Sequence, residues 1–185
     1  MMVGITNYFL FVTAGITLNI IPGPDTLYIL GNSIAKGRRA GFLAACGIMS
    51  GCLVHISAAA LGLSVVLAKS SYAFTLLKTA GAAYLAYLGI SILFAGETRL
   101  EPDETPVPTP RRVYYQGLLT NLLNPKVALF FLSFLPQFVR SNNAYGPLPF
   151  LILGVTFFTT GSIWCLALAL FASRMTGFLR KNMPV

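Results

Sequence analysis

The sequence predicts an all-α, polytopic membrane protein in which five transmembrane helices form a single domain over residues 1–185. Hydrophobic residues make up 56% of the chain, charged residues only 10%, and the mean hydropathy is +0.74. Average soluble chains are about 25% charged, so most of this chain has no polar face to turn toward water. At about 20 residues per transmembrane helix, five or six spans fit into 185 residues, whereas two membrane domains do not.

The first hydrophobic run covers residues 3–30 and is interrupted by Pro22-Gly23-Pro24-Asp25. It is long enough to cross a membrane with a break inside it. No Lys or Arg precedes this run, and it exceeds the length of a signal-peptide core. We therefore interpret it as a retained helix. It leads into a basic loop that contains Lys36, Arg38 and Arg39.

The second and third runs, residues 40–67 and 72–95, are plain spanning helices by length. Small residues at Gly47xxxGly51 and at residues 80–83 predict close packing against neighbouring helices. His55, the only histidine, lies in the middle of the second run. Two interpretations of it stay open: a proton relay, or a neutral imidazole hydrogen-bonded to a neighbouring helix.

Residues 97–112 are hydrophilic and hold four of the five acidic residues and four of the eleven prolines. Such a segment cannot form a buried helix, so we predict a cytoplasmic loop. The fourth hydrophobic run, residues 113–139, contains a second interruption at Asn124-Pro125-Lys126. The fifth run, residues 147–172, precedes a short basic tail.

The distribution of Lys and Arg predicts the orientation of these five spans. Nine basic residues fall in the first loop, the third loop and the tail, against three on the opposite side and one, Lys126, within a span. Positive residues concentrate on the cytoplasmic side. We therefore expect the tail and the loops at residues 36–39 and 97–112 inside the cell, and the N-terminus outside.

Several function classes are excluded or disfavoured by the sequence. The net charge is +8, but the basic residues are scattered between apolar runs, which argues against nucleic-acid binding. The three cysteines form no CxxC pair, so neither a disulfide framework nor a metal site is expected. Walker A, GxSxG and HExxH motifs are absent from the sequence. We predict no cofactor, no metal and no catalytic residues, and therefore not an enzyme.

The two interrupted runs are where we expect function. Each proline removes a backbone donor, and unpaired carbonyls are tolerated at membrane depth only against protein or a water-lined cavity. The two interruptions also align, with Asn19 beside Asn121, Pro24 beside Pro125 and Asp25 beside Lys126. A repeat three spans apart is inverted in the membrane, which is typical of secondary transporters, although chance or packing similarity is an alternative. The predicted substrate-binding residues are Asn19, Pro22, Gly23, Pro24, Asp25, Asn121, Asn124, Pro125 and Lys126.

Asp25 and Lys126 are the only charges well inside apolar runs, where an unpaired charge costs several kcal/mol. We expect them to form a salt bridge in the empty state and to separate for a zwitterion, Lys126 taking its carboxylate and Asp25 its ammonium. A permanent structural bridge, or a helix cap by Asp25, is the alternative. Asp25 and His55 are the candidate proton-coupling residues.

These motifs resemble those of the lysine exporter and homoserine/threonine exporter family. The resemblance rests on Asn-x-x-Pro-Gly-Pro-Asp at residues 19–25 and Asn-Pro-Lys at residues 124–126, and it continues through most of the chain. It is also carried by residues 36–41, 47–51, 81–89, 120–121, 130–131 and 135–138. The resemblance implies a transporter domain in the bacterial inner membrane that exports amino acids, in exchange for protons. It favours a neutral substrate such as leucine, threonine or homoserine.

Family members usually have six hydrophobic segments arranged as three plus three, whereas this chain shows five. We therefore expect the last helix of an inverted repeat to be missing, dispensable or replaced by a homodimer partner. Two alternatives to an exporter follow: a truncated, non-transporting remnant or scaffold, and a small membrane enzyme acting on lipid head groups. The absence of a catalytic cluster disfavours the enzyme.

Overall fold

The computed structural model describes residues 3–70, 72, 73, 75, 76, 79, 83 and 109–182. Within this part the chain is helical, and the only strand-like pairing is an isolated antiparallel bridge between Ile5 and Val139. The elements, in chain order, are α1 (Tyr8–Ile20), α2 (Pro24–Lys36), α3 (Arg38–Lys69), α5 (Pro110–Leu122), α6 (Pro125–Leu129), η1 (Phe130–Phe134), η2 (Leu135–Phe138) and α7 (Leu148–Asn182). The predicted all-α membrane class is confirmed.

The first predicted run is two helices rather than one. α1 ends at Ile20, and α2 starts with Pro24 as its first residue, after an extended Gly23. Proline suits the first helical position because its missing N–H has no partner there anyway. The predicted break and restart at Pro24 are both confirmed. α1 is apolar around its whole circumference, as expected for a helix in lipid or in a buried core.

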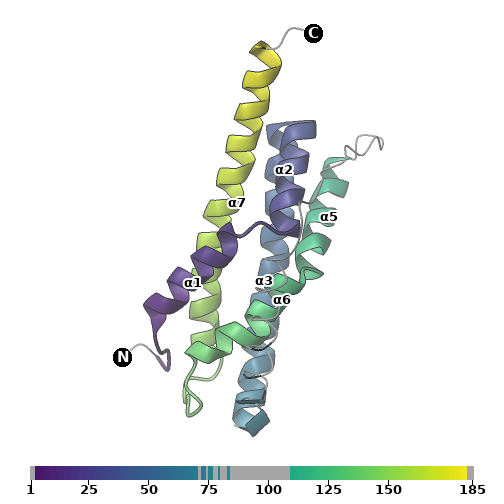
Figure 1. The fold of residues 1–185 in the computed structure, drawn as a ribbon. Helices are drawn as coiled ribbons and strands as arrows, with labels where there is room; N and C mark the ends of the chain where they lie inside the picture. Colours follow the sequence, from purple (N-terminus) through teal and green to yellow (C-terminus); the bar gives the residue numbers. More distant parts are fainter. Residues whose placement is uncertain are drawn as a thin grey trace.

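α2 and α3 form a tight antiparallel hairpin that turns at Gly37 (Figure 1). Gly37 has a φ of 81°, a conformation that favours glycine. At Gly41 the two helices are so close that a Cβ atom would lie 3.2 Å from the Cα of Ser33. α3 then continues for 32 residues and agrees with the second predicted run, extended by two residues at each end.

The fourth predicted run is bent at its interruption. The axes before and after the break, Pro110–Leu122 and Pro125–Phe138, differ by 46°. After α6 the helix widens into a π-helical turn at η1 and tightens into the 3₁₀ helix η2. Pro136 accounts for part of this irregularity, because it cannot donate a hydrogen bond to the preceding turn.

α7 extends further than predicted. The sequence suggested a helix over residues 147–172 followed by a basic tail, but α7 runs to Asn182. Residues 173–182 contain no proline, so no residue in this segment breaks the helix; the next proline in the sequence is Pro184. The C-terminal end of α7 therefore projects beyond the α2–α3 turn (Figure 1).

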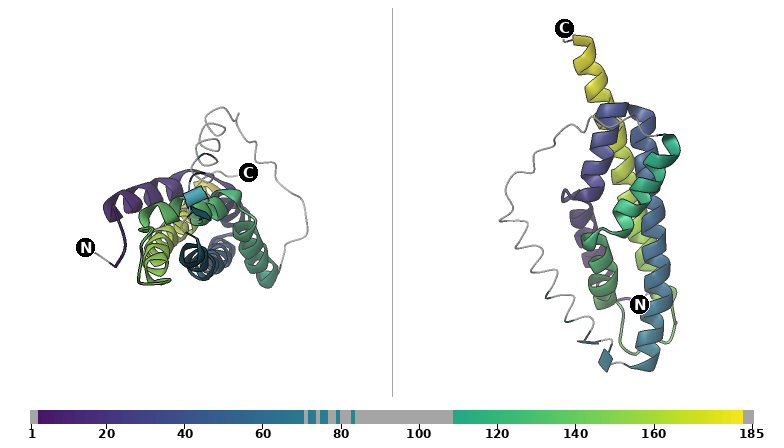
Figure 2. Two further views of the ribbon diagram at one scale, coloured as in Figure 1. Left: turned by 90° about the horizontal axis from the view of Figure 1, so that it is seen from below. Right: turned by 90° about the vertical axis from the view of Figure 1, so that its right-hand side faces the viewer.

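α3 is the central element of the described bundle, with α5, α7 and α2 packed against it. α2, α3 and α7 run side by side along the long axis of the molecule (Figure 2). Among the described residues, two single helices are long and apolar enough to cross a membrane, Arg38–Val66 and Leu148–Arg174, and the bent pair α5–η2 makes a third if it is one span. Most of the third predicted run, residues 72–95, and most of the loop 97–112 lie outside the described residues.

Aromatic side chains fill the core beside the second break. Phe11, Phe130, Phe131 and Phe150 are fully buried. The rings of Phe130 and Phe157 stack with centroids 4.1 Å apart, and Phe11 meets Phe138 edge to face at 5.2 Å. This cluster joins α1, η1, η2 and α7, so it fixes the irregular segment that follows the break.

Candidate functional site

The first break leaves carbonyl groups at the end of α1 without their usual helical donors. Pro22 and Pro24 have no N–H, so the carbonyls of Leu18 and Ile20, four residues earlier, cannot be paired within the helix. α1 therefore ends with free acceptors and the negative end of its dipole. This is the kind of site that favours a cation.

Lys126 provides that cation from the other break. Its Nζ donates to the carbonyl of Leu18 at 3.2 Å and to that of Ile21 at 2.9 Å. A Cβ atom on Gly23 would lie 3.2 Å from the same Nζ, so the glycine leaves room for the ammonium group. Lys126 is thus stabilised by the end of α1.

The second break leaves the carbonyl of Asn121 without its helical donor, because the residue four positions later is Pro125. This carbonyl accepts from the backbone N–H of Asn124 at 3.1 Å instead, and Nε2 of His55 on α3 lies 3.2 Å from it as a second partner. Since a carbonyl only accepts, His55 carries a proton on Nε2. Its ring also stacks on Phe131 with an interplanar angle of 4°. This geometry is that of the hydrogen-bonded histidine, one of the two interpretations left open by the sequence.

Asn124 and Pro125 start the helix that carries Lys126. The side-chain Oδ1 of Asn124 accepts from the backbone N–H of Lys126 at 3.0 Å, which is an N-cap. Pro125 is the first residue of α6. These two residues shape the backbone and thereby position Lys126.

Asp25 lies in the first turn of α2, where the positive end of a helix dipole stabilises a carboxylate. Its Oδ2 accepts from Asn121 Nδ2 at 2.8 Å. Asn121 is held in place by α3, because a Cβ atom on Gly51 would lie 2.8 Å from both its Cβ and its Oδ1. Close approach at Gly51 therefore determines where the amide meets the carboxylate.

The two breaks are interlocked, since each uses a polar group from the other. Lys126 reaches the end of α1, and Asn121 reaches the start of α2. The expected salt bridge, however, does not form: Lys126 is bonded to carbonyls and Asp25 to an amide, and Asp25 Oδ1 has no partner among the described residues. The prediction of a direct ion pair was wrong, because helix ends supply the opposite partial charges.

Asn19, the counterpart of Asn121 in the sequence alignment, faces α7 instead. Its Nδ2 donates to Thr160 Oγ1 at 3.3 Å. A Cβ atom on Gly161 would lie 3.2 Å from Asn19 Oδ1, so this contact too needs a small residue on the facing helix. The two aligned asparagines thus have different partners.

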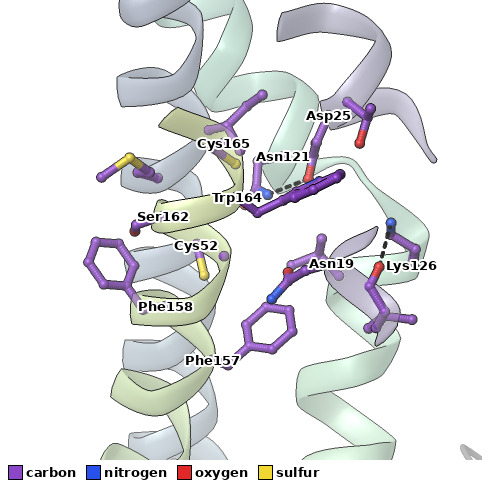
Figure 3. Close-up of a pocket in the computed structure, with 16 residues that line it drawn as sticks. Asn19, Asp25, Cys52, Asn121, Lys126, Phe157, Phe158, Ser162, Trp164 and Cys165 are labelled. Atoms are coloured by element: carbon purple, nitrogen blue, oxygen red, sulfur yellow. Dashed lines mark hydrogen bonds between the residues drawn. The ribbon is translucent and has the colours of Figure 1, made fainter. Parts of the chain in front are cut away.

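A cavity of about 50 Å³ lies where the two breaks meet α3 and α7 (Figure 3). That volume is enough for a few water molecules. Four of the predicted site residues line it: Asn19, Asp25, Asn121 and Lys126. Pro22, Gly23, Pro24, Asn124 and Pro125 are not in its wall and act on the backbone. The remaining lining residues are Leu18, Thr26, Ile48, Met49, Cys52, Val127, Phe157, Phe158, Gly161, Ser162, Trp164 and Cys165.

Sequence analysis missed the contribution of α7 to this cavity. Ser162 and Trp164 come from α7, whose run was interpreted only as a spanning helix. Both residues lie in the cavity wall. A signal was available: few side chains in residues 148–172 have a hydrogen-bonding group, and these two are among them.

Five buried polar side-chain atoms have no hydrogen-bond partner among the described residues. They are Asp25 Oδ1, Asn121 Oδ1, Asn124 Nδ2, Ser162 Oγ and Trp164 Nε1. Four of these five atoms belong to residues that line the cavity, all but Asn124 Nδ2. Buried polar atoms are normally paired, so this concentration indicates a site for a small molecule with both donors and acceptors. No group of three or more His, Cys, Asp or Glu side chains suited to a metal occurs in the described part of the chain.

Comparison with known proteins gives three findings. A family model described as LysE type translocator matches residues 16–183. An uncharacterised membrane protein of Pseudomonas aeruginosa is 33% identical over 184 residues, which covers 97% of this chain and 85% of that protein. The leucine efflux protein of Salmonella typhimurium is 33% identical over 154 residues, covering 83% and 73% of the two chains. No solved structure matches the chain.

Proposed function

The chain belongs to the LysE type translocator family, and we propose that it exports neutral amino acids such as leucine, threonine or homoserine across the bacterial inner membrane. The observation that carries the proposal is the cavity between the two interlocked breaks, with unpaired polar atoms of both kinds in its wall. Discontinuous helices whose ends face a central cavity are a common way for transporters to bind small polar substrates.

A neutral substrate is favoured by the composition of the cavity wall. Among the described residues that line it, Asp25 and Lys126 are the charged ones, and Lys126 is already bonded to two carbonyls. Asp25 therefore remains for one ammonium group, and this part of the wall holds no second acid for a dibasic substrate. Ile48, Met49 and Val127 offer an apolar surface to the substrate side chain. The leucine efflux protein of Salmonella typhimurium supports the same substrate class.

We assign proton exchange to Asp25. A carboxylate that binds a substrate ammonium on one face of the membrane and a proton on the other couples the two fluxes. Its buried Oδ1 belongs to a residue that lines the cavity and has no hydrogen-bond partner among the described residues, so it is left to accept from either. His55, the other candidate, uses its Nε2 proton on the carbonyl of Asn121. Without a Walker A motif in this chain, an ion gradient or the gradient of the substrate itself has to supply the energy.

The orientation remains the one expected from the basic residues: the α2–α3 turn and the C-terminal end of α7 in the cytoplasm, and the N-terminus outside. Both cytoplasmic segments lie toward the same end of the bundle, as this orientation requires (Figure 1). A homodimer, a third span over residues 72–95, and an inverted repeat that lacks its last helix also stay predictions.

Export is tested with the variant Asp25→Asn in cells that overproduce the protein. Cells with the unchanged chain should tolerate inhibitory leucine analogues and lower their internal leucine pool, with a matching rise outside. Asp25→Asn should lose at least about 90% of this efflux, because the amide cannot bind an ammonium or carry a proton as a carboxylate does. Equal amounts of both proteins in the membrane are the necessary control.

The same experiment separates the competing functions. Unchanged pools for every amino acid, with the unchanged chain verified in the membrane, would favour the non-transporting scaffold. Altered lipid composition instead would favour an enzyme. Full efflux by Asp25→Asn would leave export intact and exclude the role of Asp25.

A further inference from the structure

A second hollow lies between the start of α3 and the C-terminal half of α7, at the end of the bundle where α7 stands beside the α2–α3 turn (Figure 1). It is an open groove of about 560 Å³, a volume within the usual range of ligand sites. The described residues that line it are Arg38, Arg39, Phe42, Leu166, Ala169 and Leu170. It shares no described lining residue with the central cavity, so the proposed transport function does not account for it.

The groove lies where two candidate membrane spans end. Arg38 is the first residue of the span Arg38–Val66, and Leu170 lies about one helical turn before the end of the span Leu148–Arg174. The apolar lining residues therefore belong to the hydrocarbon region, whereas the two arginines belong to the level of the lipid head groups. A ligand that fills this groove needs an apolar part and a polar end.

The polar rim of the groove is positively charged. The side chains of Arg38 and Arg39 are exposed and make no hydrogen bond or ion pair within the described part of the chain. Arg174, also exposed, follows Leu170 by four residues and so lies on the same face of α7, one turn beyond the groove. α3 begins at Arg38 without a side-chain cap, and the positive end of its dipole adds to the charge.

This combination matches an anionic phospholipid. Guanidinium groups bind phosphate oxygens through two parallel N–H donors, and basic pockets between membrane helices recognise anionic head groups. A zwitterionic phospholipid adds a cation that the arginines repel. A soluble anion would leave the apolar lining unused, and an uncharged lipid would leave the arginines without a counter-ion.

We propose that the groove binds one anionic phospholipid, with the phosphate on Arg38 and Arg39 and an acyl chain against Phe42, Leu166 and Leu170. The site goes beyond the proposed function and does not depend on which substrate is transported. Because the lipid contacts both α3 and α7, its binding stabilises the folded bundle.

The test uses the purified full chain in detergent micelles, titrated with phosphatidylglycerol or with phosphatidylcholine of the same acyl chains. Native mass spectrometry measures the fraction of protein that carries one lipid and thereby the Kd. The variants are Arg38→Gln and Arg39→Gln. Lys36→Gln is the matched control, because it removes one positive charge from the same turn, although Lys36 donates to Asn32 Oδ1 at 3.2 Å and does not line the groove.

We expect the unchanged chain to bind phosphatidylglycerol at least about 10-fold more tightly than phosphatidylcholine, and each arginine variant to bind it about 10-fold more weakly. Lys36→Gln should stay within about threefold of the unchanged chain, since a basic residue near anionic lipid contributes only about a fivefold attraction even when its charge is free. Without lipid, all three variants should melt like the unchanged chain, which shows that they are folded.

A third probe, glycerol 3-phosphate, separates the lipid from a soluble anion. It has the phosphate without the acyl chains, so it should bind more than about 100-fold more weakly than phosphatidylglycerol. Equally tight binding of both would overturn the inference in favour of a soluble anion.

Two further results would overturn it. If the unchanged chain did not prefer phosphatidylglycerol, the arginines would be left to another partner, such as the acidic residues of the segment 97–112. If Lys36→Gln lost as much affinity as the arginine variants, the charge of the turn as a whole would attract the lipid, without a specific site in the groove.

Discussion

Lys126 shows how one charged side chain is stabilised at membrane depth without an opposite charge. Its ammonium group meets the carbonyls of Leu18 and Ile21, which have lost their helical donors to the Pro22–Pro24 break. Each carbonyl carries a partial negative charge, and the α1 dipole adds to it. A fixed cation of this kind holds the ends of two broken helices together.

Replacing Lys126 by Met should therefore destabilise the protein. Each carbonyl left unpaired costs about 1–3 kcal/mol. We expect the melting temperature of the purified protein to fall by about 5 °C or more. Thermal denaturation, with the monodisperse fraction measured at each temperature, checks this. Lys69→Met, at the exposed end of α3, is the matched control and should change little. Unchanged melting of the Lys126 variant would contradict its bonding to α1.

His55 illustrates a residue whose role sequence left undecided. Its Nε2 proton is donated to the carbonyl of Asn121, which lacks the i+4 donor at Pro125 and also accepts from the backbone N–H of Asn124. A glutamine has an amide N–H that reaches a similar distance, whereas phenylalanine has no donor.

His55→Gln should therefore retain leucine efflux within about twofold and keep its dependence on the pH gradient. His55→Phe should lower the amount of folded protein in the membrane, because the Asn121 carbonyl is left without this donor. Efflux by vesicles with an imposed pH gradient measures both. Loss of the pH dependence in His55→Gln, with efflux retained, would show instead that His55 carries the proton.

At the scale of elements, closely packed glycines set the distance between α3 and α5. A Cβ atom on Gly47 or on Gly117 would collide with a backbone carbonyl of the facing helix, Tyr114 or Ala44 respectively. Gly51 continues the same contact at Asn121. The sequence predicted a close-approach face at Gly47xxxGly51, and this is confirmed. The packing matters for function because it places the Asn121 amide at Asp25.

Gly51→Ala should push α5 away and destabilise the protein by about 1–3 kcal/mol, as overpacking does. The control is Gly62→Ala on the same helix, where no atom lies within 4 Å of the added Cβ. Alanine there should be neutral or stabilise α3 by up to about 1 kcal/mol, because it is the better helix former. Thermal denaturation of both variants measures the two changes in stability. Similar melting of the two would mean that α3 and α5 are not closely packed at Gly51.

Proline placement explains how one sequence both breaks and restarts its helices. Pro24, Pro110 and Pro125 each lie at the start of a helix, where the missing N–H costs nothing. Pro22 and Pro125 also remove a donor from the helix before them. The same short proline-containing segment therefore ends one helix and starts the next.

On the scale of the whole molecule, the bundle is long, and its functional cavity is formed by parts distant in sequence. Asp25, Asn121 and Trp164 come from α2, α5 and α7 and meet at one cavity (Figure 3). The predicted orientation of this bundle depends on the nine-to-three distribution of Lys and Arg between the two sides.

Reporter fusions test that orientation. A cytoplasm-active reporter inserted after residue 38, in the α2–α3 turn, and after residue 105 should be active. One inserted at residue 143, in the segment between η2 and α7, should report the outside. Opposite activities at all three positions would invert the bundle, and the reading of export as outward movement would have to be reconsidered.

Much of this architecture follows from the sequence alone. The apolar runs and the small number of charges determined a helical membrane protein, since hydrocarbon admits only segments that pair their own backbone groups. The prolines located both breaks, because a missing N–H acts within a few residues of the chain. Asn19, Asp25, Asn121 and Lys126, predicted to bind substrate as polar groups beside breaks in apolar runs, line the cavity, and their binding of substrate stays a prediction.

Only the tertiary structure decided the partners. The opposite charges of Asp25 and Lys126 predict an ion pair, but the hydrogen bonds that form depend on which helix end each side chain reaches. That is determined by the 46° bend at the second break and by the close approach of α3 at Gly51. The place of Ser162 and Trp164 in the cavity wall depends on tertiary packing as well. α7 packs against α1, α2 and α3, and the polar atoms of these two side chains have no hydrogen-bond partner among the described residues.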